Sequence, residues 1–341
     1  MNWPLNVNNF SFLDRVKICK FILNPSNRWT QGDRVKEFES KMADYVGCKY
    51  SVYVSSGSTA NSLLADYQKS ICGEKNIVVL PSTTWQTSCA PWIKAGFQPK
   101  FIDVNLSDFS MDLPKLEEFI IENQDRIACI FPTSLIGFTP KMSEYQRLHR
   151  QYGVNINFDN CENTFGSYKN KNISSFFTST TSTSSYENKL VDSLFDFYSL
   201  GNNFRNTDVN AFVGMLDLKR IKKYTKSRKE LYNLFKSKLD SSKFYLPQEL
   251  EEVGNVPFCL PIICKDNKKN IALRICKDLG IEHRPIISGF LGYQTCYKEF
   301  FHDEEDYANS IYLHHNGFYV GLFHTLSKTK IEKLVIELNN I

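Results

Sequence analysis

Two neighbouring stretches decide the fold class of this chain: "NIVVLPSTTW" (Asn76–Trp85) and "AGFQPKFIDVN" (Ala95–Asn105). The first has the pattern of a buried strand that ends in a polar loop, and the second contains the next strand. Similar strand-plus-loop units recur at 126–135 and 154–166, with the helix-like segment 143–153 between them. Strands that alternate with helices predict a three-layer α/β fold, with a mostly parallel sheet covered on both faces. Ligands of such sheets bind at loops beyond the carboxyl ends of the strands.

Toward the N-terminus the alternation continues with a helical pattern over 34–47, which ends in Gly47, and a strand, turn and helix over 50–70. After Arg220 the pattern changes to a long, basic, amphipathic helix, a strand at 256–264 and smaller α and β units up to the C-terminus. We therefore predict a large domain over 1–217 and a smaller C-terminal α+β domain over 218–341, which starts with a long linker helix. A helix at the N-terminus is expected to be able to pack on the small domain.

The composition is that of an ordinary globular chain of 341 residues, with 42% hydrophobic and 23% charged residues. The net charge is +4, but basic and acidic residues are interspersed, so a nucleic-acid partner is not expected. No run of 18 apolar residues suggests a membrane span, and the N-terminus lacks a signal-peptide pattern. The cytoplasm is the expected location.

The ten cysteines are widely spread and include no C-x-x-C pair. In a reducing compartment we expect most of them to be small buried apolar residues. The alternative is an iron–sulfur cluster held by the four cysteines nearest the C-terminus, which are Cys259, Cys264, Cys276 and Cys296. The spacing of these four cysteines matches no established cluster motif.

The segment "VSSGSTANSLL" (54–64) joins a strand to a helix through small polar residues. Gly57 allows close approach of a ligand to the backbone, while Ser58 and Thr59 offer hydroxyl and N–H donors. The positive end of the helix points at the same place, which suits a phosphate. The same residues are also typical of an ordinary helix cap, so this segment alone does not decide between the two.

Two further loops carry candidate ligand-binding side chains. Trp85 follows a strand and either stacks on a planar ring or packs at a domain edge. Asp159 ends an apolar strand, where a carboxylate can keep a pyridine nitrogen protonated, with Glu162 three residues further on. The alternative for Asp159 is a cap of the next turn.

The segment "LGNNFRNTDVNAFVG" (200–214) precedes another amphipathic helix. Thr207 or Asp208 is sufficient to cap that helix. Asn203 and Arg205 are not needed for the cap and are therefore candidates for a functional role.

Together these segments resemble the DegT/DnrJ/EryC1/StrS sugar aminotransferase family, whose members have the pyridoxal-phosphate-dependent fold type I. The resemblance extends from "RWTQGDRVKEFESKMADYVG" (28–47) to "HHNGFYVGLFHTLS" (314–327). The resemblance rests on four motifs: "SSGSTAN", "FDNCENTFGS", "VDSLFDFYSLGNNFRNTDVNAFVG" and "GIEHRPIISG". In addition, a tryptophan at the position of Trp85 is typical of the nucleotide-sugar 3-dehydratase branch.

The resemblance implies a pyridoxal 5'-phosphate or pyridoxamine 5'-phosphate cofactor. Its phosphate is expected at Gly57, Ser58 and Thr59, helped by Ser182. Its ring is expected to stack on Trp85 and to meet a set of polar side chains: Asp159 at the ring nitrogen and Glu162 near the ring oxygen.

The resemblance also implies a substrate and a partner. Asn203 is expected to reach the phosphate bound by a second copy of the chain, which predicts a homodimer with shared sites. Arg284 and Arg205 are the candidates for binding a nucleotide-activated 4-keto-6-deoxyhexose or a similar keto-sugar.

The catalytic segment of the family is not found in this sequence. "SFFTSTTSTS" (175–184) resembles the strand that delivers the phosphate-binding serine, here Ser182. Five residues later the family has a lysine, or histidine in the dehydratase branch, whereas this chain has Glu187. Lys189 is seven residues after Ser182, and the two extra residues displace an amine by about 6–7 Å along a strand. Lys189 and Glu162 are therefore weak candidates for the catalytic group.

Two functions remain open from the sequence. The first is an aminotransferase or 3-dehydratase that makes deoxy- or amino-sugars for surface polysaccharide, with the cofactor held non-covalently. The second is a non-catalytic homologue that binds cofactor or nucleotide-sugar, or pairs with an intact relative.

Overall fold

The computed structural model describes residues 2–180, 184–186, 203–248 and 250–341. Its larger sheet is built by hydrogen-bonded strands and by single bridges that join Ile130 to Ile156 and Thr133 to Asp159. In spatial order the strands are β3 (Gln98–Ile102), β2 (Ile77–Pro81), β4 (Ile127–Ile130), β5 (Phe158–Asp159), β8 (Ser179–Thr180), β9 (Ser184–Tyr186) and β1 (Tyr50–Val52). All neighbouring pairs are parallel except those of β9, which confirms the predicted mostly parallel sheet.

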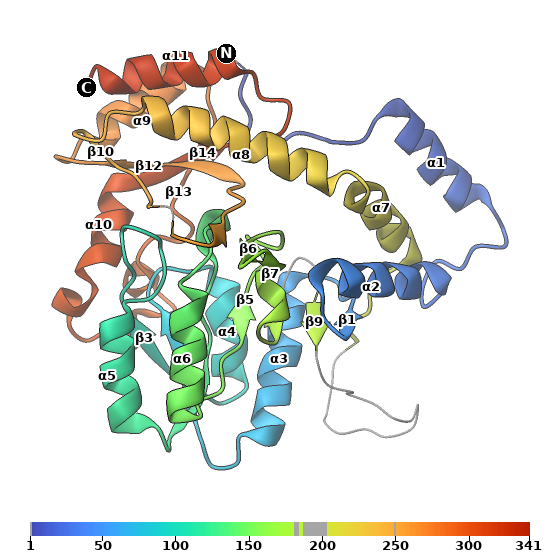
Figure 1. The fold of residues 1–341 in the computed structure, drawn as a ribbon, viewed down its shortest axis with the longest axis horizontal. Helices are drawn as coiled ribbons and strands as arrows, with labels where there is room; N and C mark the ends of the chain where they lie inside the picture. Colours follow the sequence, from blue (N-terminus) through green and yellow to red (C-terminus); the bar gives the residue numbers. More distant parts are fainter. Residues whose placement is uncertain (1, 181–183, 187–202, 249) are drawn as a thin grey trace.

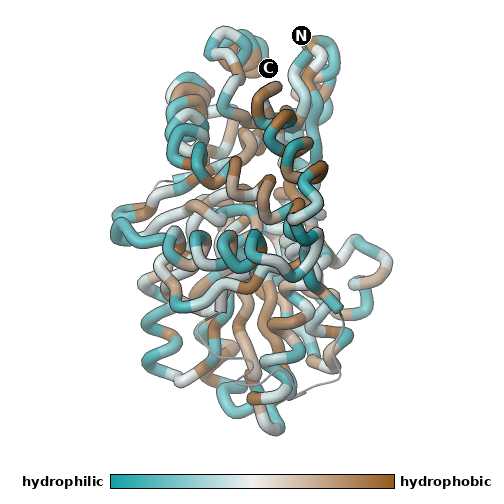
Figure 2. Tube along the Cα trace, turned by 90° about the vertical axis from the view of Figure 1, so that its right-hand side faces the viewer, coloured by the Kyte–Doolittle hydropathy of each residue, from teal (hydrophilic) through white to brown (hydrophobic). Residues whose placement is uncertain are grey.

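Helices cover both faces of this sheet, as Figure 1 shows. α3 (Gly57–Ile71) and α4 (Gln86–Lys94) pack on one face around Leu80 and Phe131. α5 (Leu113–Asn123) and α6 (Met142–Tyr152) pack on the other. The central strands β2 and β4 are buried along their whole length, and they form the brown centre of the lower half in Figure 2. Burial on both faces explains their continuous apolar sequence.

A second, antiparallel sheet belongs to the C-terminal part, in the order β10 (Phe244–Tyr245), β12 (Cys259–Cys264), β14 (Gly317–Gly321) and β13 (His283–Pro285). Helices α9 (Lys269–Asp278), α10 (Ala308–Asn316) and α11 (Lys328–Asn339) pack against its core. α8 (Ile221–Lys238) is the long linker helix, and in Figure 1 it runs from the end of α7 across the upper, C-terminal half. A small third sheet joins the halves, with β11 (Val253–Gly254), β6 (Ser167–Tyr168) and β7 (Lys171–Asn172).

The N-terminal residues reach both halves of the molecule. The Trp3 indole is fully buried in the C-terminal core and donates a hydrogen bond from Nε1 to the Gly321 carbonyl (2.8 Å). α1 (Phe12–Leu23) instead packs on α7 (Asp208–Leu218), where Phe21 stacks on Phe212. The predicted boundary between the large and the small domain at residue 217 remains a proposal.

Two helix ends match the sequence patterns. α2 (Asp33–Val46) ends at Gly47, whose positive φ of 81° is the left-handed conformation that glycine favours. Thr207 caps α7, whereas the Asp208 carboxylate accepts from the backbone N–H groups of Gly32, Arg34 and Val35 at the start of α2. Asp208 therefore stabilises the start of α2, a helix that is distant from it in sequence.

The cysteines in the described residues are free thiols, and six are buried, as expected for small apolar core residues. Within those residues no group of three or more histidine, cysteine, aspartate or glutamate side chains is arranged to hold a metal ion. None of the described helices is long and apolar enough to cross a bilayer.

Candidate active site

A cavity of about 400 Å³ lies beyond the carboxyl ends of the strands, between the large sheet and the C-terminal sheet. Six of the residues predicted from sequence line it: Gly57, Ser58, Trp85, Asp159, Glu162 and Arg284. The other lining residues are Asn61, Thr87, Ser88, Thr133, Cys161, Phe258, Ile287 and Tyr319. Segments far apart in the sequence therefore converge here, at the position expected for a ligand of a parallel sheet.

Asp159 forms the floor of the cavity at the end of β5 and is only 3% exposed. Its Oδ2 accepts hydrogen bonds from Asn61 Nδ2 (3.0 Å) and Ser88 Oγ (2.7 Å), and its Oδ1 accepts from the Cys161 N–H (3.1 Å). Three donors around one carboxyl group fix its orientation. Such a group can hold the proton of a heterocyclic nitrogen.

The start of α3 forms another wall. The Ser56 side chain accepts from the Thr59 N–H, and the Thr59 hydroxyl in turn accepts from the Ser56 N–H (3.0 Å), which is a capping box. The N–H groups at Gly57 and Ser58 lie in the first turn, where the helix dipole favours an anion. The Thr59 hydroxyl is used by the cap and does not line the cavity.

Gly57 is required by a close approach to Cys161. A Cβ atom at Gly57 would lie 2.7 Å from the Cys161 Sγ, closer than real Cβ atoms approach. We expect Gly57→Ala to lower the free energy of unfolding by about 1–3 kcal/mol, because the loop that carries Asp159 must shift. Chemical denaturation measures this loss, and Cys161→Ala in the same chain should restore most of it. Equal losses with and without the Cys161 sulfur would contradict the proposed contact.

Glu162 is the second carboxyl group of the cavity. Its Oε2 accepts a hydrogen bond from the Ile136 N–H (2.6 Å), and its half-buried side chain lines the cavity. Burial, with a smaller effect of the Asp159 charge, raises the pKa of Glu162 from 4.5 to about 8. Glu162 is therefore the carboxyl group of the cavity whose environment favours the protonated form, as a proton-transfer role requires.

The remaining walls provide an aromatic surface and a cation. Trp85 stands at the start of α4 and is 46% exposed, so its ring is available to a ligand rather than packed in the core. Arg284 lies on β13 opposite Tyr319 of β14, and both line the cavity. The C-terminal sheet thus brings a guanidinium to the open side of the pocket.

Other predicted site residues do not line this cavity. Asn203 and Arg205 are exposed, and the Asn203 side chain accepts from Arg205 Nε (2.8 Å). Arg205 lines a separate hollow beside α2 and β1. Ser182 and Lys189 lie outside the described residues, so their predicted roles stay predictions.

Asn61 and Ser88, the two side chains that hold Asp159, were not predicted from the sequence. Asn61 lies four residues after Gly57, on the same face of α3, and this spacing is the signal that could have identified it. Within the described part of the chain its buried Oδ1 has no hydrogen-bond partner, whereas its Nδ2 donates to Asp159.

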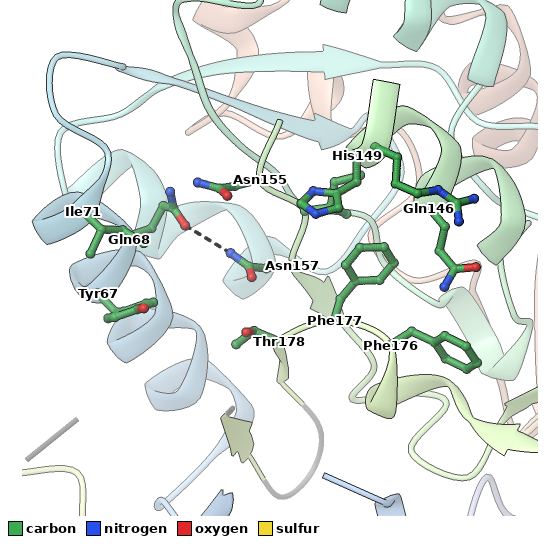
Figure 3. A pocket seen from close by; sticks show the side chains of 12 residues that line it. Tyr67, Gln68, Ile71, Gln146, His149, Asn155, Asn157, Phe176, Phe177 and Thr178 are labelled. Atoms are coloured by element: carbon green, nitrogen blue, oxygen red, sulfur yellow. Dashed lines mark hydrogen bonds between the residues drawn. The ribbon is translucent and has the colours of Figure 1, made fainter. Parts of the chain in front are cut away.

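A second hollow of similar volume, about 390 Å³, lies on α3, α6 and the entry to β5 (Figure 3). Its two buried amides bond to each other, since Asn157 Nδ2 donates to Gln68 Oε1 (3.3 Å), and Gln68 Nε2 donates to the Ala128 carbonyl. None of the described residues lining it is a carboxylate. Its described lining therefore lacks the acidic groups that the cavity at Asp159 provides.

The fold and the site together define a protein of the pyridoxal-phosphate-dependent transferase fold, fold type I. The sequence profile of the DegT/DnrJ/EryC1/StrS aminotransferase family matches residues 21–196 and 187–339, and the chain belongs to this family. The two matched stretches overlap at 187–196, so the chain matches the family in two parts and not in one continuous stretch.

Individual relatives are distant but nearly full-length. The GDP-4-keto-6-deoxy-D-mannose 3-dehydratase of Escherichia coli O55:H7 is 24% identical over 377 residues, covering 94% of this chain and 95% of the relative. The alignment exceeds the 341 residues of the chain, so the relative has residues without a counterpart here. The GDP-perosamine synthase of Caulobacter vibrioides is 24% identical over 288 residues, with 75% and 76% covered.

A solved structure of the E. coli 3-dehydratase with bound hydrated PLP shares the fold, with a TM-score of 0.87 and 22% identity over 99% of both chains. The likeness confirms the predicted α/β fold of type I.

Proposed function

We propose that this chain binds pyridoxal or pyridoxamine 5'-phosphate without a covalent bond and acts on a nucleotide-activated keto-sugar, as a 3-dehydratase or aminotransferase that makes deoxy- or amino-sugars. The observation that carries the proposal is the single cavity that joins the Asp159 carboxylate, the start of α3, Trp85 and Arg284. The relatives support it, since their names describe action on GDP-linked sugars.

The residues fit this cofactor in chemical type. The start of α3 would hold the phosphate, Trp85 would offer its ring face to the pyridine ring, and Asp159 would hold the proton of the ring nitrogen. When bound, the cofactor supplies an electron sink beside the sugar.

Glu162 is the group that holds or moves a proton. No lysine or histidine is among the described residues that line the cavity. Because the pKa of Glu162 is raised to about 8, its carboxyl group is protonated at neutral pH and can donate from Oε1 or Oε2 toward the substrate side. Arg284 orients the anionic part of the nucleotide-sugar at the open side.

The second candidate is a non-catalytic homologue that binds cofactor or nucleotide-sugar, or pairs with an active relative. The division of the family match into two parts that overlap at 187–196 favours it, because Glu187, which the resemblance aligns with the family's lysine or histidine, lies in this part of the sequence. Loss of such a group costs many orders of magnitude in rate.

Borohydride reduction tests the non-covalent mode. We expect the chain mixed with pyridoxal 5'-phosphate to release the cofactor on dialysis and to carry no lysine-bound product after borohydride, because no lysine has the family's position. Mass spectrometry of the digested chain measures this. A reduced adduct at Lys189 would overturn it.

Activity then separates the two candidates. The chain is incubated with pyridoxamine 5'-phosphate and GDP-4-keto-6-deoxy-D-mannose, and the nucleotide-sugars are separated. Release of a deoxy-sugar supports the enzyme, and cofactor binding without product supports the non-catalytic homologue. Failure to bind either cofactor would overturn the proposed function.

We further propose a cytoplasmic homodimer. Asn203 and Arg205 are exposed and do not line the cavity of their own chain, so they are available to the site of a second copy. Sedimentation of the purified chain tests the dimer.

A further inference from the structure

The two halves of the molecule contribute different residues to the candidate active site. Those expected at the cofactor come from the large sheet and the loops and helices that follow its strands: Gly57, Ser58, Trp85, Asp159 and Glu162. The C-terminal half contributes four further lining residues: Phe258, Arg284, Ile287 and Tyr319. A substrate bound between the cofactor and the C-terminal sheet, which lies above the large sheet in Figure 1, therefore meets these four residues.

Tyr319 carries the hydroxyl of this C-terminal wall. Phe258 and Ile287 are apolar and Arg284 is a cation, so Tyr319 is the one uncharged polar side chain among the described residues that the C-terminal half contributes to the cavity. The guanidinium suits the diphosphate of a nucleotide-sugar. The hydroxyl is then left for an uncharged part of the ligand.

The C-terminal sheet fixes Tyr319 beside Arg284. Tyr319 on β14 lies directly opposite Arg284 on β13, in an antiparallel pair. Side chains of directly opposed residues leave the same face of a sheet, with Cβ atoms about 4.5–5.5 Å apart. Because both residues line the cavity, this face is the one turned toward a ligand.

The ring of Tyr319 is held by a second contact. It packs edge-on against the Phe258 ring, with centroids 5.8 Å apart and an interplanar angle of 79°. Such an aromatic pair limits the orientations that the ring can adopt. Strand pairing and ring packing together restrict where the Tyr319 hydroxyl can lie before any ligand binds.

The Tyr319 hydroxyl is available as a neutral donor. Within the described part of the chain it forms no hydrogen bond, and its oxygen is not fully buried. Burial of the side chain, with smaller effects of Cys259 and Glu162, raises the pKa of Tyr319 to about 12, and the Arg284 charge opposes this shift. Near neutral pH the group is therefore a phenol that donates a hydrogen bond and does not act as a base.

We propose that Tyr319 is a specificity-determining residue, whose hydroxyl donates a hydrogen bond to a hydroxyl or carbonyl oxygen of the sugar in the nucleotide-sugar. The assignment rests on the proposed function, because it takes the ligand of the cavity to be a nucleotide-activated sugar. The sugar must reach the cofactor at Asp159 to react, so the sugar, and not the nucleoside, is the uncharged part of the ligand inside the cavity. A nucleotide without the sugar leaves the hydroxyl unused.

Tyr319→Phe tests the assignment, because it removes the hydroxyl and keeps the ring against Phe258. The chain is loaded with pyridoxal 5'-phosphate, which has no amino group to transfer, and is titrated calorimetrically with GDP-4-keto-6-deoxy-D-mannose and with GDP. The variant is expected to bind the nucleotide-sugar about three- to tenfold more weakly, the effect of one lost neutral hydrogen bond. Its affinity for GDP should stay close to that of the original chain.

Two further variants are the controls. Tyr245→Phe makes the same change on β10, at the edge of the same sheet and outside the cavity, and should alter neither affinity. Arg284→Met should weaken both ligands, because it removes the expected partner of the diphosphate. A loss confined to the nucleotide-sugar is not the result of a general weakening of the fold, which would affect GDP as well.

The outcomes separate this assignment from the proposed function. Equal affinity of the original chain and Tyr319→Phe for the nucleotide-sugar would overturn the assignment alone. An equal loss for GDP would place the hydroxyl at the nucleotide and would also overturn it. Failure of the original chain to bind GDP-4-keto-6-deoxy-D-mannose would overturn the proposed substrate and, with it, the role of Tyr319.

Discussion

Asp159→Asn is expected to weaken the binding of pyridoxamine 5'-phosphate about 100-fold, close to 3 kcal/mol. The carboxylate accepts from Asn61 Nδ2, Ser88 Oγ and the Cys161 N–H, so the site is built for an acceptor with two oxygens. An amide places an NH₂ group where one of these donors or the ring proton must bind, and it carries no charge to hold that proton. The loss combines a missing charge-assisted hydrogen bond with a conflict between donors.

Titration of the cofactor's absorbance or fluorescence measures this loss. Asp44→Asn is the matched control, because Asp44 is exposed on α2 and far from the cavity in sequence and structure. Circular dichroism should show that both variants fold. Cofactor affinity within threefold of the original chain would contradict the assignment of Asp159 to the ring nitrogen.

The fold was predictable because its signals are local and periodic. Strands β2 and β4 are continuous apolar runs, and α2 combines apolar residues at helical spacing with Gly47 at its end. Once these elements alternate, the parallel sheet follows, and with it the edge where Gly57, Trp85 and Asp159 meet.

Other features depended on distant contacts and could not be read from local patterns. Asp208 was a candidate cap of α7, but its carboxylate instead serves the start of α2, over 170 residues away in sequence. Trp3 fills the C-terminal core, and Asn61 and Ser88 converge on Asp159 only because α3 and α4 pack on the same face. Such roles depend on how elements pack, which single-sequence spacing does not encode.

Glu162→Gln is expected to stabilise the folded chain at neutral pH by about 1–3 kcal/mol. The pKa of Glu162 rises from 4.5 in an ordinary setting to about 8 in the folded chain, so the folded form keeps a proton that the unfolded form releases. Its contribution to stability is complete below about pH 4.5 and is lost as the pH rises toward 8. Each pKa unit corresponds to about 1.4 kcal/mol, and water in the cavity reduces the full value. A glutamine side chain keeps the acceptor for the Ile136 N–H but has no proton to release.

Urea denaturation of both chains between pH 5 and 9 measures the effect. The difference in unfolding free energy should grow in favour of the variant as the pH rises and should level off above about pH 8, where Glu162 is ionised in both states. Comparison at each pH cancels the other titrating groups, which the two chains share. Parallel curves, with a constant difference from pH 5 to 9, would show that Glu162 is already ionised at neutral pH. In that case the group could only accept a proton there, and the proposed chemistry would need another donor.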